Sequence, residues 1–279
     1  MRSLRRDLVS KKNLIIILFG LIMLSAIIAL ILVNKGGPIR VPVGKSVSLS
    51  NLLSQARLSE MESNLLEAKY IYQKIINEFP NSSEVMSWQK KLEDINMKLL
   101  FSQVLTPKSA LYEIKPGDTL TKIAKEFKTT TDLIMKSNNL ADGKIFPGRK
   151  IKVWTSLFSI LIDKSQNTLI LKSDEEVIKT YVVSTGKNNS TPVGNFRITN
   201  KLINPTWFKA GAVFPAGSPE NVLGSRWLGF DLPSYGIHGT TEPQTLGKQV
   251  TQGCVRMLNA EVEEVYSIVA VGTEVSIVD

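Results

Sequence analysis

The sequence is poor in the residues that build metal centres and disulfide frameworks. Its 279 residues include one Cys and one His. A lone Cys cannot form an intramolecular disulfide, and one Cys with one His is too few for the clustered ligands of a zinc site. Gly and Pro, 18 and 12 residues, are too scarce for a fibrous or low-complexity chain. We therefore expect globular domains without a structural metal.

Negative charge is scarce at one end of the chain. The formal net charge is +9, yet residues 1–50 alone hold eight Lys or Arg against one Asp. Residues 106–156 hold ten basic against five acidic residues, and residues 157–279 hold ten against twelve. Positive charge gathered beside an apolar segment is typical of membrane topology rather than of a nucleic-acid surface. We expect no nucleic-acid partner.

Residues 14–33 form an uncharged apolar run that predicts a transmembrane helix. As a helix the run would span about 30 Å, the thickness of a hydrocarbon core. The basic residues before it are Arg2, Arg5, Arg6, Lys11 and Lys12. They predict a cytoplasmic segment at 1–13 and export of the chain after residue 33. A cleaved signal peptide is the alternative, but the run is long for one and no small-x-small site comes after it.

A linker at 34–50 and a helical spacer at 51–105 are expected next. The linker is rich in Gly, Pro, Ser and Val. In the spacer, steps of four and three predict one apolar helix face through Met61, Leu65, Ala68, Tyr72, Ile75 and Phe79. Ala68, Tyr72 and Pro80 resemble half of a tetratricopeptide unit. A single unit does not make a solenoid, so a spacer packed on its neighbours is favoured over a peptide-binding groove.

Residues 111–154 predict a small domain in the order strand, helix, helix, strand. Leu111–Ile114 and Lys150–Val153 have strand composition. The first helix begins after Asp118 or Thr119, either of which is a good helix cap.

Three motifs of this segment resemble the LysM (lysin motif) domain. They are the Pro-Gly-Asp-Thr-Leu turn at 116–120, the Asn-Asn-Leu helix end at 138–140 and the Pro-Gly turn at 147–148. That family binds glycans containing N-acetylglucosamine, so the resemblance implies a shallow groove between turns 115–120 and 143–148. The expected glycan-binding residues are Gly117, Asp118, Thr119, Ile145 and Pro147. A structural domain that binds no glycan is the alternative.

Residues 157–279 predict a mainly-β domain with its own core. The expected strands are Phe158–Asp163, Thr168–Lys172, Val177–Ser184, Gly194–Thr199, Leu228–Phe230, Tyr235–His238 and Glu274–Val278. One helix is expected, from Ala260 to about Val269.

The only Cys and the only His both fall in this domain, at Cys254 and His238. A thiolate is a strong nucleophile, and an imidazole can take its proton and return it to a leaving amine. Gly253 directly before the Cys lets backbone N–H groups approach a developing oxyanion. Arg256 adds a fixed positive charge, which would hold a substrate carboxylate or the loop itself. A buried structural Cys and a core His are the alternative.

The surrounding motifs resemble the catalytic domain of the L,D-transpeptidases. They are Ser184-Thr185-Gly186, Thr191-Pro192-Val193-Gly194-Asn195-Phe196, Asn204-Pro205-Thr206-Trp207, Leu223-Gly224-Ser225-Arg226-Trp227-Leu228, Tyr235-Gly236-Ile237-His238-Gly239-Thr240 and Thr251-Gln252-Gly253-Cys254-Val255-Arg256. They are collinear with the family over about 157–279. Many members have Ser-His before Gly-Cys, whereas this chain has Thr251-Gln252. No second His is therefore present, and His238 must act alone.

The resemblance implies a role for each matching residue. Cys254 would be the acylated nucleophile, His238 the base and acid, and the Gly239 carbonyl the group that orients the imidazole. Backbone N–H groups of Gly253 and Cys254 would stabilise the oxyanion, while Arg256 would be structural or hold substrate. Thr251, Tyr235 and Trp207 are expected to contact substrate. The chemistry requires no metal or organic cofactor.

The implied reaction is acyl transfer on peptidoglycan stem peptides, forming 3→3 cross-links through a thioester. The same acyl-enzyme would serve an L,D-carboxypeptidase or a ligase that joins a protein to peptidoglycan, and a non-catalytic wall-binding protein is a further alternative. The expected partners are stem peptides, glycan strands and the membrane. We expect a single-pass protein of the bacterial inner (cytoplasmic) membrane, with its catalytic domain on the extracytoplasmic side.

The expected fold is therefore multidomain. An N-terminal transmembrane helix and a helical spacer precede a small βααβ LysM-like domain at 111–154 and a mainly-β L,D-transpeptidase-like domain at 157–279.

Overall fold

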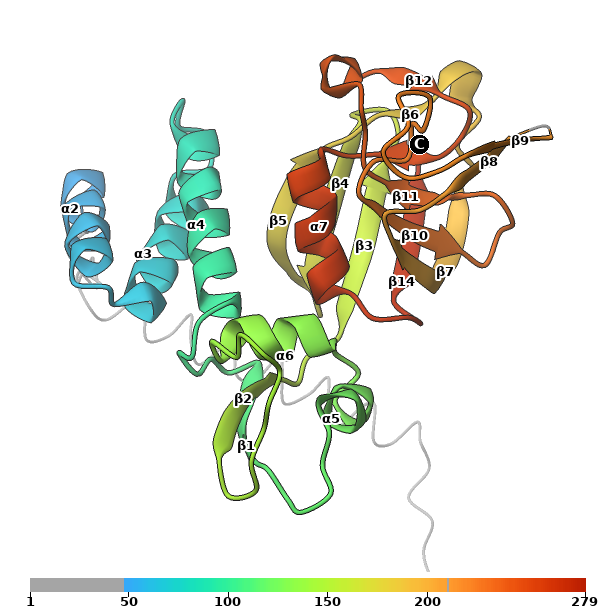
Figure 1. Ribbon diagram of the computed structural model, residues 1–279. Helices are drawn as coiled ribbons and strands as arrows, with labels where there is room; N and C mark the ends of the chain where they lie inside the picture. The colour runs from blue at the N-terminus through green and yellow to red at the C-terminus, as the bar shows by residue number, and fades with distance from the viewer. Residues whose placement is uncertain (1–47, 210) are drawn as a thin grey trace, which may run out of the picture. The chain divides into compact units, whose positions relative to one another are not determined.

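The computed structural model describes residues 48–209 and 211–279 (Figure 1). The expected cytoplasmic segment 1–13, the membrane span 14–33 and nearly all of the linker lie outside the described residues. Within the two described ranges, no helix is both long enough and apolar enough to cross a bilayer.

The spacer consists of three helices, α2 (Leu49–Met61), α3 (Leu65–Glu78) and α4 (Val85–Leu100). The expected apolar face through Met61 is wrong at that residue, because α2 ends there and the Met61 side chain is 82% exposed. Asn64 then begins α3 by accepting a hydrogen bond from the Glu67 N–H. The core between the helices is built on Ala56, Ala68, Tyr72, Ile75, Trp88 and Ile95.

Hydrogen bonds tie α4 to both neighbouring domains. Asn96 Nδ2 donates to the carbonyls of Val177 and Ile178, at 3.2 and 3.3 Å. The buried Lys152 ammonium donates to the Leu99 carbonyl, 2.6 Å away, at the end of α4. Burial lowers the pKa of Lys152 to about 8. These contacts agree with a spacer that packs on its neighbours.

The small domain has the strand–helix–helix–strand order. It comprises β1 (Ser109–Glu113), α5 (Leu120–Glu126), α6 (Thr131–Ser137) and β2 (Lys150–Trp154). The strands are antiparallel, with Glu113 opposite Lys150. Thr119 and Thr130 cap the two helices by accepting the N–H groups of Lys122 and Leu133. The cap of α5 is therefore Thr119 rather than Asp118.

The C-terminal domain is built around an eight-stranded mixed sheet. The strand order is β13-β11-β10-β7-β14-β3-β4-β5. Pairs β14–β3 and β11–β13 are parallel, and the other neighbours are antiparallel. The strand bounds are β3 (Phe158–Asp163), β4 (Thr168–Ser173), β5 (Glu176–Val182), β7 (Gly194–Ile203), β10 (Arg226–Phe230), β11 (Gly236–His238), β13 (Val255–Arg256) and β14 (Glu274–Val278).

Helix α7 (Asn259–Ile268) lies against this sheet (Figure 1). Its buried residues Val262, Val265 and Ile268 join the core of the domain. Lys201 Nζ, on β7, donates to the Tyr266 and Val269 carbonyls and so closes the C-terminal end of the helix. The packing therefore fixes α7 against β10 and β11.

Two small sheets and two 3-10 turns complete the domain. One sheet pairs β6 (Thr185–Gly186) with β12 (Gln249–Thr251) in parallel, and the other is the hairpin of β8 (Trp207–Lys209) and β9 (Ala212–Phe214). The 3-10 turns are η1 (Lys187–Asn189) and η2 (Pro243–Thr245). Because β12 ends three residues before Cys254, the β6–β12 pair holds the chain that leads to the thiol.

Candidate active site

Two adjacent parallel strands bring His238 and Cys254 to one region. His238 ends β11 and lies opposite Arg256 of β13, while Ile237 lies opposite Val255. Cys254 directly precedes β13. Residues two apart on a strand share a face, so the register carries Cys254 and Arg256 toward the same face as His238. His238 and Cys254, sixteen positions apart in sequence, are thus brought together by two neighbouring strands.

The His238 imidazole is held in one tautomer. The residue is 3% exposed, and its Nδ1 lies 2.6 Å from the Gly239 carbonyl oxygen. A carbonyl only accepts, so Nδ1 carries the proton and Nε2 keeps a free lone pair. The Trp227 ring stacks on the imidazole, with centroids 6.1 Å apart and planes at 19°. Gly239 therefore takes the orienting position that the resemblance implied.

Burial keeps this imidazole neutral. It lowers the pKa of His238 to about 4, with a smaller effect of the Arg256 charge in the same direction, while the Gly239 carbonyl acts against both. A neutral imidazole with a free Nε2 is a proton acceptor across the physiological range.

The Cys254 thiol is protonated in this state. Burial raises its pKa, and the Gly236 N–H and the Arg256 charge only partly offset that effect. The sulfur donates to the Ser234 carbonyl oxygen at 3.4 Å. No hydrogen bond joins the thiol to the imidazole in the described structure. The thiol and the imidazole are thus both neutral, and proton transfer between them would require the thiol to leave Ser234 and approach Nε2.

A hydrogen bond fixes the carbonyl side of the peptide between Gly253 and Cys254. Thr191 Oγ1 donates to the Gly253 carbonyl at 2.9 Å and accepts the Gly186 N–H at 2.7 Å. Since a peptide's C=O and N–H point in opposite directions, this bond aims the Cys254 N–H away from Thr191. Gly253 itself has φ +133°, and a Cβ there would lie 2.6 Å from the Tyr235 ring. Only Gly fits this position without displacing the ring.

One expected oxyanion donor is already engaged. The Gly253 N–H donates to Thr251 Oγ1 at 3.2 Å, and that hydroxyl donates to the Cys254 carbonyl. The Gly253 N–H therefore closes a local turn. The Cys254 N–H has no hydrogen-bond partner among residues 48–209 and 211–279 and is the donor that remains.

The guanidinium of Arg256 is bound within the protein. It is 7% exposed, and Nη1 contacts Glu242 Oε2 at 2.7 Å and Thr245 Oγ1 at 2.9 Å. Of the two roles expected for Arg256, these contacts favour holding the η2 loop over holding a substrate carboxylate. Its charge also lowers the pKa values of both His238 and Cys254.

Of the three residues expected to contact substrate, two lie near the Cys254 thiol and one lies on a separate hairpin. Tyr235 packs beside Gly253, and Thr251 bonds to the Cys254 carbonyl, so both adjoin the thiol. Trp207 lies on the β8–β9 hairpin, where its ring contacts Phe214 with centroids 5.1 Å apart. The described contacts of Trp207 are within that hairpin.

The two predicted walls of the glycan groove leave the same end of the β1–β2 pair. The Gly148 N–H donates to the Ile114 carbonyl at 2.8 Å, which places turns 115–120 and 143–148 side by side. Asp118 Oδ2 accepts the Lys115 N–H at 2.8 Å and the Tyr112 hydroxyl at 2.9 Å. The Lys115 N–H is the main cause of the lowered pKa of Asp118. The Asp118 side chain therefore stabilises the turn through these two hydrogen bonds.

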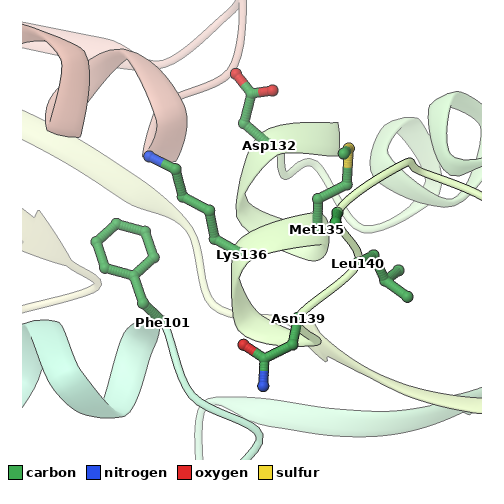
Figure 2. Close-up of a pocket in the computed structure, with 7 residues that line it drawn as sticks. Phe101, Asp132, Met135, Lys136, Asn139 and Leu140 are labelled. Atoms are coloured by element: carbon green, nitrogen blue, oxygen red, sulfur yellow. The ribbon is translucent and has the colours of Figure 1, made fainter.

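A separate hollow of about 730 Å³ lies beside α6 and the residues that come directly after it (Figure 2). Its lining residues are Phe101, Asp132, Met135, Lys136, Asn139, Leu140 and Ala141. The Lys136 ammonium lies 5.1 Å from the centre of the Phe101 ring. None of the expected glycan-binding residues lines this hollow.

Several contributors to the site carried no clear signal in the sequence. Trp227 stacks on His238, and Asn259 binds the loop that comes after His238. Trp227 lies in the Leu223–Leu228 motif but Asn259 lies in none of the motifs, and the contacts of both residues depend on segments far apart in the chain. In the part of the chain that the structure describes, no group of three His, Cys, Asp or Glu residues is placed to hold a metal ion.

Comparison with known proteins defines the family. The YkuD model, the L,D-transpeptidase catalytic domain, matches residues 158–277, and the LysM domain model matches 112–154. YkuD of Bacillus licheniformis, which is named as an L,D-transpeptidase, is 37% identical over 175 residues, 60% of this chain and 98% of that protein. YkuD of Bacillus subtilis is 35% identical over 60% of this chain and 97% of that protein. YqjB of Bacillus subtilis is 41% identical over 43% and 70%.

The chain therefore belongs to the YkuD L,D-transpeptidase family, with a LysM domain before the catalytic domain. Membership supports a transpeptidase enzyme, and the two domains together point to peptidoglycan as its binding partner.

Proposed function

We propose that this L,D-transpeptidase forms 3→3 cross-links in peptidoglycan through a thioester on Cys254, while residues 14–33 anchor it in the membrane. The observation that carries the catalytic part is the His238 tautomer. The Nδ1–H is bound to the Gly239 carbonyl, so Nε2 is left as a base on the strand that pairs with β13, which begins directly after the only Cys in the sequence.

The first half-reaction is acylation. The Cys254 sulfur attacks the carbonyl carbon of the third stem residue, and His238 Nε2 takes the thiol proton as the S–C bond forms. The Cys254 N–H stabilises the oxygen that becomes negative. The C–N bond to the terminal D-residue then breaks, and the imidazolium returns the proton to the leaving amine. The product is a thioester and a free D-amino acid.

The second half-reaction regenerates the thiol. The side-chain amine of the third residue in another stem attacks the thioester carbon, and His238 removes a proton from that amine. The C–S bond breaks, an amide forms between two third residues, and the proton passes to the Cys254 sulfur. The atoms balance without any further reactant.

Product analysis tests this function. The purified full chain in detergent would be incubated with a defined disaccharide tetrapeptide, and the products would be sequenced by tandem mass spectrometry. We expect a dimer that has lost one D-residue and is linked between two third residues. If tripeptide alone accumulates, the chain is an L,D-carboxypeptidase, and the cross-linking proposal is overturned.

The LysM domain is expected to contribute to wall binding through its paired turns. In a Cys254→Ala background, Asp118→Ala should weaken cosedimentation with insoluble peptidoglycan by about tenfold, since the turn loses the two hydrogen bonds that hold its shape. Glu126→Ala, at an exposed position at the end of α5, is the matched control. Equal binding by both variants and the parent would contradict a glycan-binding role for these turns.

The anchor is expected to remain on the mature protein. The chain produced in bacteria should fractionate with membranes and resist extraction by high salt. Its amino-terminal sequence should begin at Met1 or within the next few residues. A mature start near residues 34–40 would instead identify a cleaved signal peptide.

A further inference from the structure

Asn259, the first residue of α7, joins two loops through one side-chain amide. Its Oδ1 accepts the Thr240 N–H at 3.0 Å and the Ser225 N–H at 3.1 Å. Its Nδ2 donates to the Thr240 carbonyl at 2.9 Å. The amide is therefore bonded on both its donor and its acceptor sides to backbone.

Two glycines make room for this amide. A Cβ at Gly239 would lie 2.1 Å from Asn259 Oδ1, and a Cβ at Gly224 would lie 2.2 Å from the same atom. Such distances are impossible for real atoms, so any larger residue at either position would expel the Asn259 side chain. The approach of Asn259 thus accounts for Gly239, whereas Gly224, whose φ is +65°, also lies directly against the backbone of Gly239 and Thr240.

The Thr240 N–H and the Gly239 carbonyl belong to the same peptide unit. In a trans peptide these two groups point in opposite directions within one plane. Asn259 Oδ1 holds the N–H edge, and the carbonyl edge faces His238 Nδ1 at 2.6 Å. Fixing one edge of the plane fixes the direction of the other.

We propose that Asn259 is a positioning residue that orients the Gly239 carbonyl and thereby holds His238 in the tautomer whose Nε2 is free. The expected effect of Asn259 on the reaction rate rests on the proposed function. The expected effect on the His238 tautomer does not, because it can be measured without any substrate. Asn259 touches neither thiol nor imidazole and acts only through the peptide between Gly239 and Thr240.

The single His allows a direct test by NMR. In the full chain labelled with 15N-histidine, one imidazole contributes all ring signals, because the sequence has no other His. The parent protein should show a protonated Nδ1 and an unprotonated Nε2. Asn259→Ala should give averaged ring signals from mixed tautomers. Unchanged ring signals in Asn259→Ala would overturn the proposal, whether or not the chain forms 3→3 links.

Kinetics supply the second readout. Asn259→Ala should lower kcat for release of the D-residue by about 10–100-fold with little change in KM, since a small misplacement of a catalytic group costs up to that factor. Asn259→Asp keeps an oxygen that accepts the Thr240 N–H, but it replaces the Nδ2 donor with an oxygen that faces the Thr240 carbonyl, so it should recover only part of the loss. A fall in kcat that Asn259→Asp does not relieve would contradict the role given to Oδ1.

Asn138 offers a matched control outside the catalytic domain. Its amide also bonds a helix end to backbone, accepting the Lys152 N–H and donating to the Lys152 and Ile134 carbonyls. Asn138→Ala should lower stability to a similar extent while leaving the His238 ring signals and kcat on a short soluble donor unchanged. If Asn138→Ala alters both as strongly as Asn259→Ala does, general destabilisation explains the effect and the proposal fails.

Discussion

Replacing Cys254 with Ala is expected to lower the rate of D-residue release by more than about 10³-fold. The change removes the only thiol in the chain, so no neighbouring Cys can take over. The side chain is small and only partly buried, and the free energy of unfolding should therefore change by no more than about 1 kcal/mol. The measurement is a donor-release assay on the full chain, with thermal unfolding as the check on folding.

Cys254→Ser separates nucleophilicity from shape. A Ser hydroxyl is far harder to deprotonate than a thiol, so we expect almost as large a loss although the size is nearly kept. A structural thiol would predict the opposite pattern, with full activity in both variants and slow alkylation of the parent. Release by Cys254→Ala at the parent rate would exclude the thioester mechanism.

His238→Ala is expected to cost about 10²–10⁴-fold in kcat/KM, the usual worth of a general base. The thiol pKa is raised by burial, so without the imidazole little thiolate forms near neutral pH. The neighbouring position that carries His in many family members is Gln252 here, which offers no substitute base. Alkylation of Cys254 by iodoacetamide at pH 7 should slow in the same variant.

The pH dependence supplies the control for His238. Because the pKa of His238 is lowered to about 4, the imidazole is neutral and able to accept a proton at all pH values above that. The acid limb of kcat/KM should therefore lie near pH 4 rather than near 6.5, the ordinary value for His. An acid limb near 6.5 would mean that water reaches the ring, contrary to its burial.

The sequence pattern located several of the longer elements and the two reactive residues, although β7, expected to end at Thr199, continues to Ile203. β3 and β14 begin and end where alternation predicted, at Phe158–Asp163 and Glu274–Val278. His238 and Cys254 could be singled out because each is the only residue of its type. Hydrophobic periodicity and residue composition can be judged from a short stretch of sequence, and that is enough to predict a strand or to single out a unique residue.

Features that depend on distant segments were not readable. Strands β6 and β13 have two residues each and form only by pairing with β12 and β11. Two residues are too few to show an alternation of apolar and polar side chains. The hydrogen bond of the Gly253 N–H to Thr251 and that of the Thr240 N–H to Asn259 form only once the loops are folded. The break after Met61 was different, because Asn64 followed by Glu67 is a helix-start signal.

Trapping of the acyl-enzyme tests whether Cys254 carries the thioester. The full chain would be mixed with a stem tetrapeptide whose third-residue side-chain amine is blocked by acetylation, so that it cannot serve as acceptor. The reaction would be quenched in acid within the first turnover and digested for mass spectrometry. The peptide containing Cys254 is expected to gain the mass of the tripeptide acyl group, and Cys254→Ala is expected to show no adduct on any peptide. An acyl group on another residue, or turnover without any Cys254 adduct, would contradict the thioester mechanism.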